Sequence, residues 1–332
     1  MVNYGNVIQV GVAMLMIIFT GFTLAKLKIL KHSDSLALNN MVFWVGFFPL
    51  LFEGIASKKF SELNFYPCLI AGLMSISIYI ALTPIMIYPF SSRIGTYLAT
   101  AFPAAYVNYV VSGIPVFNSI WPAKENMIVS MTTISNHIVS SPIYYILVGI
   151  YKIVENNKKR REEGMPPEKF SFKILVSLII SIFKSPILVS VLCGIAYSAT
   201  GLKYVPFLDK FMEIAGNMVY ANALLCVGIF LAQHSLIACN WLQFIFCMFS
   251  RFIIGPFFAL LWCKALKLSN RLSRQCVIIC AQPTAVASYA ITCNNKLGEG
   301  VASTMIFWTS ILLVPFIILW FFILDRLNIF VE

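Results

Sequence analysis

Long apolar runs alternate with short polar breaks along almost the whole chain. A helix needs about 20 mostly apolar residues to cross about 30 Å of bilayer hydrocarbon. By that criterion the chain is predicted to be an all-α membrane protein with about ten transmembrane helices. The predicted spans cover residues 6–27, 37–56, 65–89, 94–119, 126–151, 174–200, 206–233, 239–265, 272–293 and 301–324.

One polar segment is longer than the others and separates the fifth predicted span from the sixth. It divides the chain into a first five-helix repeat at 1–151, a basic loop at 152–172 and a second five-helix repeat at 173–332. Because lysine and arginine concentrate in cytoplasmic loops, we expect this loop to face the cytoplasm. The basic turn from Lys264 to Arg274 would then lie on the other side, against the same rule.

The sixth predicted span is interrupted at Ser185-Pro186. Two interpretations are open. In one, a helix lies along the membrane interface and feeds a shorter span that begins at Pro186. In the other, one long span is tilted.

The composition excludes an ordinary soluble protein. Hydrophobic residues make up 60% of the chain and charged residues only 11%, whereas soluble domains carry about 25% charged residues. The net charge of +11 comes from residues between the apolar runs, which indicates membrane orientation and no nucleic-acid partner. The lipid bilayer is therefore the expected partner of an integral multi-pass protein, in the plasma membrane or the endoplasmic reticulum.

The nine cysteines form no CxxC motif, and most lie inside apolar runs. Cys276 and Cys280 share a helix face, but no second pair of metal ligands lies nearby in sequence. Buried cysteines often act as small hydrophobic residues. We therefore expect no metal site, no disulfide framework and no cofactor.

Proline positions indicate an internal repeat. Three pairs have nearly equal separations in sequence: Pro84 with Pro256, Pro115 with Pro283, and Pro142 with Pro315. This spacing pairs each of the third, fourth and fifth spans with the span five places later. An odd number of spans per repeat gives the two repeats opposite orientations, which is the inverted plan of many transporters.

Helix-breaking residues lie in the middle of two corresponding spans, the fourth and the ninth. Unwound backbone at membrane depth is tolerated where it is buried or lines a wet cavity, and each half-helix N-terminus carries about +0.5 charge. We therefore expect these breaks to bind the carboxylate of a small organic acid. Alternatively, they are proline kinks that shape packing only. The candidate substrate-binding residues are Asn108, Gly113, Ile114, Pro115, Gln282, Pro283, Thr284 and Ser288.

A second set of polar and helix-bending residues could line a cavity or form a gate. Arg251 lies well inside an apolar run, and intramembrane charges usually face protein or water. Glu53 and Glu213 are its candidate partners; the alternatives are a structural ion pair or an arginine that reaches the interface. The residues of this set are Asn40, Pro49, Glu53, Asn217, Asn222 and Arg251.

The segments around both breaks resemble the auxin efflux carrier family, which includes plant carriers and bacterial, fungal and protist relatives. Asn108 to Pro115 resembles the family's Asn-x-x-x-x-Gly-Ile-Pro motif. NNMVFWVGFFPLLF, with Pro49, is similar to the family's second span, and SRFIIGPFFALLW, with Arg251, to its eighth. AQPTAVASYAI resembles the ninth span. The order and spacing of these segments make the resemblance more specific than any one of them.

The resemblance implies an inverted five-plus-five fold with crossing, broken fourth and ninth helices. It also implies a homodimer formed by scaffold spans, an elevator-like movement of transport spans, and an efflux carrier of organic anions that is not an enzyme. Three positions depart from the plant carriers: Val107 and Ser288 stand where they have proline, and Gly95 where they have an acidic residue. The central loop is also short, so the chain resembles a short non-plant member and auxin itself is not the expected substrate.

Two other functions stay open. A bile-acid-type sodium symporter has similar crossed helices, but its carboxylate-rich sodium site would have only Glu53 and Glu213 to draw on in these spans. A membrane receptor of the same fold would bind a ligand without moving it. No HExxH motif, intramembrane aspartate pair or Ser/His arrangement points to an enzyme.

Overall fold

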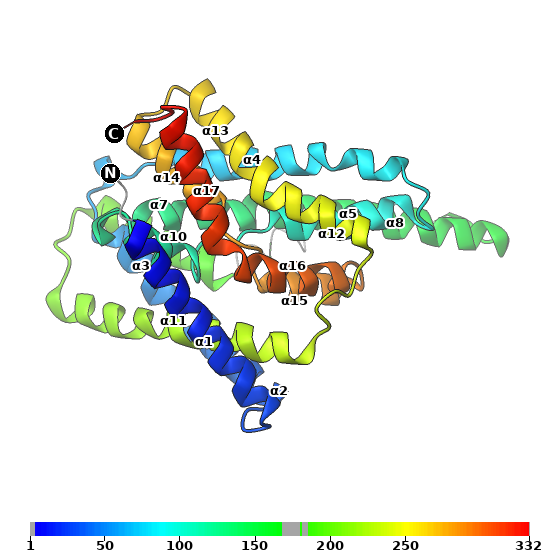
Figure 1. Ribbon diagram of the computed structural model, residues 1–332, viewed down its shortest axis with the longest axis horizontal. Helices are drawn as coiled ribbons and strands as arrows, with labels where there is room; N and C mark the ends of the chain where they lie inside the picture. The colour runs from blue at the N-terminus through cyan, green and yellow to red at the C-terminus, as the bar shows by residue number, and fades with distance from the viewer. Residues whose placement is uncertain (1–3, 168–179, 181–184, 332) are drawn as a thin grey trace.

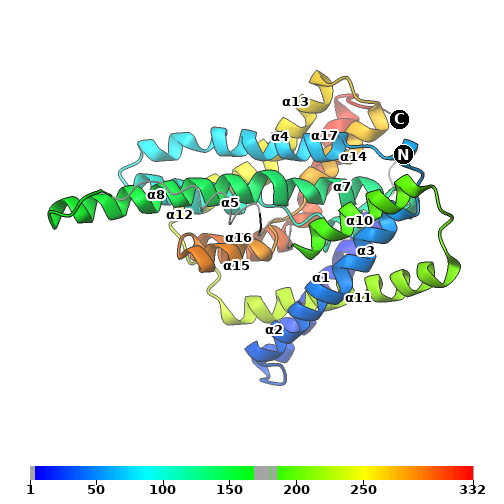
Figure 2. The ribbon, with the colours of Figure 1, turned by 180° about the vertical axis from the view of Figure 1, so that it is seen from behind.

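The computed structural model describes residues 4–167, 180 and 185–331, and this part of the chain is helical almost throughout (Figures 1 and 2). The all-α class predicted from the sequence is confirmed. The N-terminal elements are α1 (Tyr4–Lys26), α2 (His32–Met41), α3 (Phe47–Ala56), α4 (Tyr66–Ala81), α5 (Arg93–Ala105), α6 (Gly113–Asn118), α7 (Met127–Ser135) and α8 (Ser141–Glu162). The C-terminal elements are α10 (Pro186–Thr200), α11 (Pro206–Gln233), α12 (Trp241–Phe249), α13 (Gly255–Ala265), α14 (Asn270–Cys280), α15 (Ala287–Asn295), α16 (Glu299–Ile311) and α17 (Leu313–Arg326).

Three of the predicted spans contain one wider, π-helical turn. Val42–Gly46 (η1) joins α2 to α3, Asn136–Ser140 (η5) joins α7 to α8, and Ser250–Ile254 (η6) joins α12 to α13. Such turns are rare and often lie at functional sites, because they change the direction of the side chains that follow. Each of the three carries residues that line or contact the site described below.

Six helical stretches of the described chain are long and apolar enough to cross a bilayer, and α16 with α17, bent by 64°, could form a seventh crossing. Length and composition alone therefore give fewer crossings than the ten predicted. Two predicted spans fail the length criterion because they are broken: α5 ends at Ala105 before α6 begins, and α14 ends at Cys280 before α15 begins.

The continuous helix that includes α7 and α8 extends from Ala123 to Glu162, roughly 60 Å at 1.5 Å per residue. Since this exceeds the hydrocarbon thickness, its end projects beyond the other helices, as Figure 1 shows for α8. The first part of the predicted central loop is thus helical. The interfacial helix considered for 174–184 lies almost entirely outside the described residues, and α10 begins at Pro186.

The helices pack in two groups. In the α11 group (α1, α2, α3, α10 and α11), α1 packs on α11, and α3 packs on both α10 and α11. Glycines allow the closest approach: a Cβ at Gly21 or Gly228 would collide with the backbone of the facing helix. Small residues at such contacts are typical of membrane helix pairs.

The α5 group contains α4, α5, α7, α8 and α12–α16. Within it, α4 packs on α7 and α13, and α5 packs on α8, α12 and α16. Figure 2 shows α4 running nearly parallel to α7 and α8, whereas α1 and α3 cross this direction at an angle. The short α6 and the terminal α17 both contact α1, so they lie at the boundary between the groups.

Candidate functional site

The two helix breaks lie against each other. Val107 and Thr284 form an antiparallel β-bridge between the segment that follows α5 and the segment that follows α14. The N–H of Asn108 donates to the carbonyl of Pro283 at 2.8 Å, and the N–H of Ala285 donates to the carbonyl of Tyr106 at 3.1 Å. Buried backbone groups that leave a helix need other partners, and each break supplies them to the other.

Side chains from neighbouring helices hold this bridge from both sides. Asn136, in η5, donates from Nδ2 to the Val107 carbonyl at 2.7 Å and accepts from the Val107 N–H at 3.4 Å. Thr284 donates from its hydroxyl to the carbonyl of Pro103 at 2.9 Å, and its N–H donates to the Thr309 hydroxyl at 3.0 Å. Neither Asn136 nor Thr309 is among the site residues predicted from the sequence. Asn136 had a usable signal, an amide inside an apolar span, whereas Thr309 had none.

A cavity of about 320 Å³ lies beside the bridge, between the two helix groups. One wall belongs to the α11 group, with Asn39 and Asn40 as its polar residues. The other wall belongs to the α5 group. The polar residues on that wall are Tyr106, Asn108, Tyr109, Thr133, Asn136 and His137. The first turn of α15 also faces the cavity through Ala287 and Ala290. Among the described residues, the lining includes no Asp, Glu, Lys or Arg.

The predicted substrate-binding residues occupy three different environments. Asn108 lines the cavity, half-buried, and its Oδ1 accepts from the Val111 N–H at 3.2 Å, which fixes the turn that leads into α6. Pro283 faces α1 instead, beside a gap of about 10 Å³, the volume of roughly one water molecule. Thr284 lies in the bridge itself.

The remaining predicted residues lie in the packing around the bridge. Gly113 approaches Gln282, whose Cγ would be 3.6 Å from a Cβ at the glycine. Ile114 is buried and Pro115 half-buried in the first turn of α6. Gln282 Oε1 and the Ser288 hydroxyl are buried without a hydrogen-bond partner in the part of the chain that the structure describes. A substrate-binding role for these residues stays a prediction.

The predicted cavity or gate residues are also divided. Asn40 lines the cavity, whereas Pro49, Glu53, Asn217 and Asn222 lie on α3 and α11 away from the lining that the described residues form. Glu213 pairs with Lys210 at 2.6 Å.

Arg251 is fully buried and donates to two backbone carbonyls, those of Ala104 and Cys280. Among the described residues its acceptors are therefore backbone groups and not Glu53 or Glu213. The sequence could not indicate these partners, since they lie far away along the chain.

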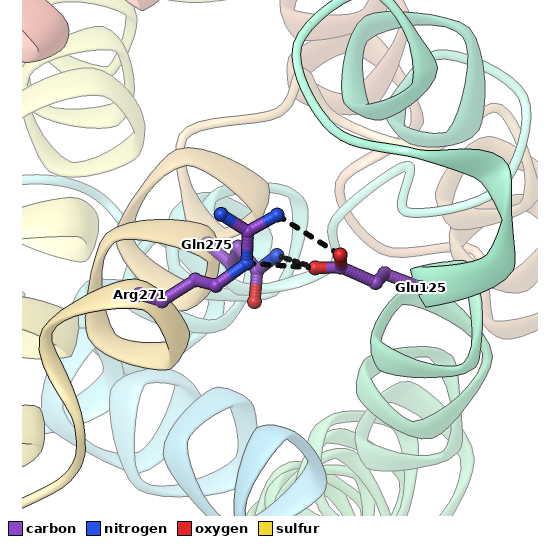
Figure 3. Close-up of polar contacts among 3 residues, drawn as sticks. All are labelled: Glu125, Arg271 and Gln275. Atoms are coloured by element: carbon purple, nitrogen blue, oxygen red, sulfur yellow. Dashed lines mark hydrogen bonds and ion pairs between the residues drawn. The ribbon is translucent and has the colours of Figure 1, made fainter. Parts of the chain in front are cut away.

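A polar cluster joins the start of the helix that contains α7 to the start of α14 (Figure 3). Glu125, in the turn between α6 and α7, accepts from Arg271 Nη2 at 2.9 Å and from Arg271 Nε at 3.1 Å. The same carboxylate accepts from Gln275 Nε2 at 2.6 Å. Arg271 and Gln275 lie on the first turns of α14, so the cluster links the start of the Ala123–Glu162 helix to α14.

Comparison with known proteins identifies the family of the chain. The model of the membrane transport protein family matches residues 6–321. The chain belongs to that family. This membrane transport protein family is also that of the auxin efflux carriers, so the resemblance seen around both breaks is confirmed. Together with the apolar helices, membership identifies an integral multi-pass membrane protein and a transporter. No curated protein matches the chain.

Proposed function

We propose that this family member is a secondary transporter, an efflux carrier, that moves a small organic anion by elevator-type alternating access. The observation that carries the proposal is the β-bridge between Val107 and Thr284, which joins two broken helices at the wall of a cavity. Converging broken helices at membrane depth are the usual substrate site of inverted-repeat transporters.

The packing of the helices supports ten spans in two inverted repeats. The six long helical stretches, the bent pair α16–α17, the shorter α10 and the two broken elements together account for ten crossings. A pseudo-two-fold axis would pair the first span with the sixth and the second with the seventh, so each contact should have a counterpart. The first span, α1, packs on the seventh, α11, and correspondingly the sixth, α10, packs on α3 of the second. Residues 1–151 and 173–332 are therefore our proposed repeats.

The position of the cavity favours an elevator. One wall belongs to the α11 group and the other to the α5 group, which also carries the bridge. If the α5 group moves against the α11 group, the bridge and its bound substrate move with it. We propose the α11 group as the scaffold. The homodimer implied by the resemblance stays a prediction.

The chemistry of the lining suits an anion. The lining that the described residues form holds no carboxylate to repel it, and the amides of Asn39, Asn40 and Asn108 offer hydrogen bonds. The N-terminus of α15 adds a positive dipole end on the same side, where Ala287 lines the cavity. The cavity is otherwise apolar, which suits the carbon skeleton of an organic acid.

Flux into proteoliposomes tests the proposal. A panel of labelled small mono- and dicarboxylates is compared with their methyl esters, with and without a sodium gradient, and against protein-free liposomes. We expect at least one carboxylate to enter faster than it enters protein-free liposomes, and its ester to enter no faster than it enters protein-free liposomes. Binding without flux would identify a receptor instead, and flux only with a sodium gradient would identify a sodium symporter.

A further inference from the structure

Arg251 contacts the ends of the two helices that stop at the breaks, and it is not among the described residues that line the cavity. It lies in the π-helical turn η6 between α12 and α13 and has no exposed surface. Nη1 donates to the Ala104 carbonyl at 2.8 Å, and Nη2 donates to the Cys280 carbonyl. Ala104 is in the last turn of α5 and Cys280 is the last residue of α14. One guanidinium therefore joins the C-terminal ends of both half-helices.

The other carbonyls at these two ends already have partners. The last four carbonyls of any helix lack partners within the helix. In α5, the carbonyls of Phe102, Pro103 and Ala105 accept from Tyr106, Thr284 and the hydroxyls of Ser75 and Ser140. In α14, those of Val277, Ile278 and Ile279 accept from Ala281 and Gln282. Ala104 and Cys280 are thus the two carbonyls that depend on Arg251.

The charge of the guanidinium matches what these ends carry. Each helix C-terminus is equivalent to about −0.5 charge, so two converging ends amount to about −1, which one guanidinium balances. Such charges are poorly screened inside a membrane, where water is scarce. A guanidinium suits the task better than an ammonium, because its planar fork reaches two acceptors in fixed directions. Gly255 leaves room for it: a Cβ there would lie 3.1 Å from Nη2.

We infer that Arg251 is a positioning residue for the place where the two broken helices meet. It is a fixed cation that holds the ends of α5 and α14 together. In other carriers, half-helix C-terminal ends and unwound carbonyls coordinate a sodium ion. Here the guanidinium of Arg251 supplies the positive charge, so the place where the two broken helices meet keeps its geometry without a bound metal cation. For the effect of Arg251 on flux, the inference rests on the proposed transport function; for its effect on the stability of the protein, it does not.

Chemical rescue tests the inference without transport. Arg251→Ala leaves a guanidinium-sized space, and its melting temperature in detergent should fall well below that of the unmodified protein. Millimolar guanidinium should raise it again, whereas urea, the neutral molecule of the same shape, should not. Arg93→Ala removes an exposed arginine from the other end of α5 and serves as the control. It should respond to neither compound. Equal responses of Arg251→Ala to guanidinium and urea, or its full stability without either, would overturn the inference.

Two further variants keep the test decisive if Arg251→Ala does not accumulate. Arg251→Lys keeps the charge and should be more stable than Arg251→Met, which keeps only the bulk; equal stability would overturn the role of charge.

In flux assays Arg251→Met should lose at least about tenfold in maximal rate, the scale of one lost charged hydrogen bond. The KM of Arg251→Lys should stay unchanged, since Arg251 lies outside the cavity. If the unmodified protein moves no carboxylate, the transport proposal fails while the melting experiment still decides the role of Arg251.

Discussion

The backbone N–H of Asn108 donates to the carbonyl oxygen of Pro283 at 2.8 Å, across a break in each of two helices. Proline at 283 has no N–H and disrupts the helix around it, so backbone groups near it become available to another segment. The net stabilisation from one such bond is only about 0.5–1.5 kcal/mol, but leaving a buried group unpaired costs about 1–3 kcal/mol. The two breaks therefore stabilise each other, and loss of one should destabilise both.

Asn108→Ala should weaken substrate binding without removing the bridge. The backbone bond to Pro283 stays, whereas the cavity loses an amide and the Val111 N–H loses its acceptor. Losing a hydrogen bond to a charged substrate costs about 1.5–3 kcal/mol, so half-saturation of flux should rise roughly ten- to a hundredfold. Asn118→Ala, at the exposed end of α6, is the control. An unchanged half-saturation in Asn108→Ala would move the substrate away from this amide.

Asn136→Ala should destabilise the protein more than Asn108→Ala does. It leaves the N–H of Val107 without its partner in a fully buried place and removes one donor from the Val107 carbonyl, which still accepts from the Tyr109 N–H at 3.1 Å. With a cost of about 1–3 kcal/mol for a buried group left unpaired, the melting temperature in detergent should fall by several degrees. A melting temperature equal to that of Asn118→Ala would show that Asn136 does not support the bridge.

Glu125→Ala should destabilise the protein more than Arg271→Ala. The Arg271 side chain is 46% exposed, and exposed ion pairs contribute roughly 0–1 kcal/mol. Gln275 is only 2% exposed, and loss of its acceptor Glu125 should cost about 1–3 kcal/mol. The melting temperatures of the two single variants and of the double variant measure the difference. The reverse order would mean that the ion pair, and not the buried amide, is the stronger link between the start of the Ala123–Glu162 helix and α14.

The basic end of α8 should face the cytoplasm. Lys158, Lys159, Arg160 and Arg161 form the densest positive cluster, and such clusters are retained on the cytoplasmic side. A tag inserted at Gly164, an exposed turn residue, should be protected from impermeant reagents in intact cells and labelled after permeabilisation. Labelling of intact cells would reverse the orientation and place the basic turn from Lys264 to Arg274 inside.

Much of the fold could be predicted from local sequence. Apolar runs long enough to span the bilayer predict membrane helices, because transfer of such a run into lipid is favourable whichever segments of the chain pack beside it. The two breaks could also be located, because glycine and proline act on their own backbone. The sequence did not indicate that 152–162 continues the helix of α8, since a solvated helical end carries no apolar pattern.

The details of the site depend on contacts between distant segments. Gln282 and Ser288 are predicted site residues because they lie near a break in sequence, but both are fully buried. Other residues, among them Asn39 and Asn136, line the cavity instead. Facing direction within an unwound segment follows no helical period, so sequence could not assign it. The acceptors of Arg251 are backbone carbonyls, which every residue has and no sequence pattern marks.

By itself, the sequence determined that this protein lies in a membrane, to which family it belongs and where two of its helices break. These follow from composition, motif order and the backbone chemistry of glycine and proline, each of which is local. Only the tertiary structure decided that the breaks pair at Val107 and Thr284, that a cavity lies beside them, and that Arg251 holds α5 to α14. Those relationships join residues far apart in the chain, and they exist only once packing has brought unpaired backbone groups within hydrogen-bond distance.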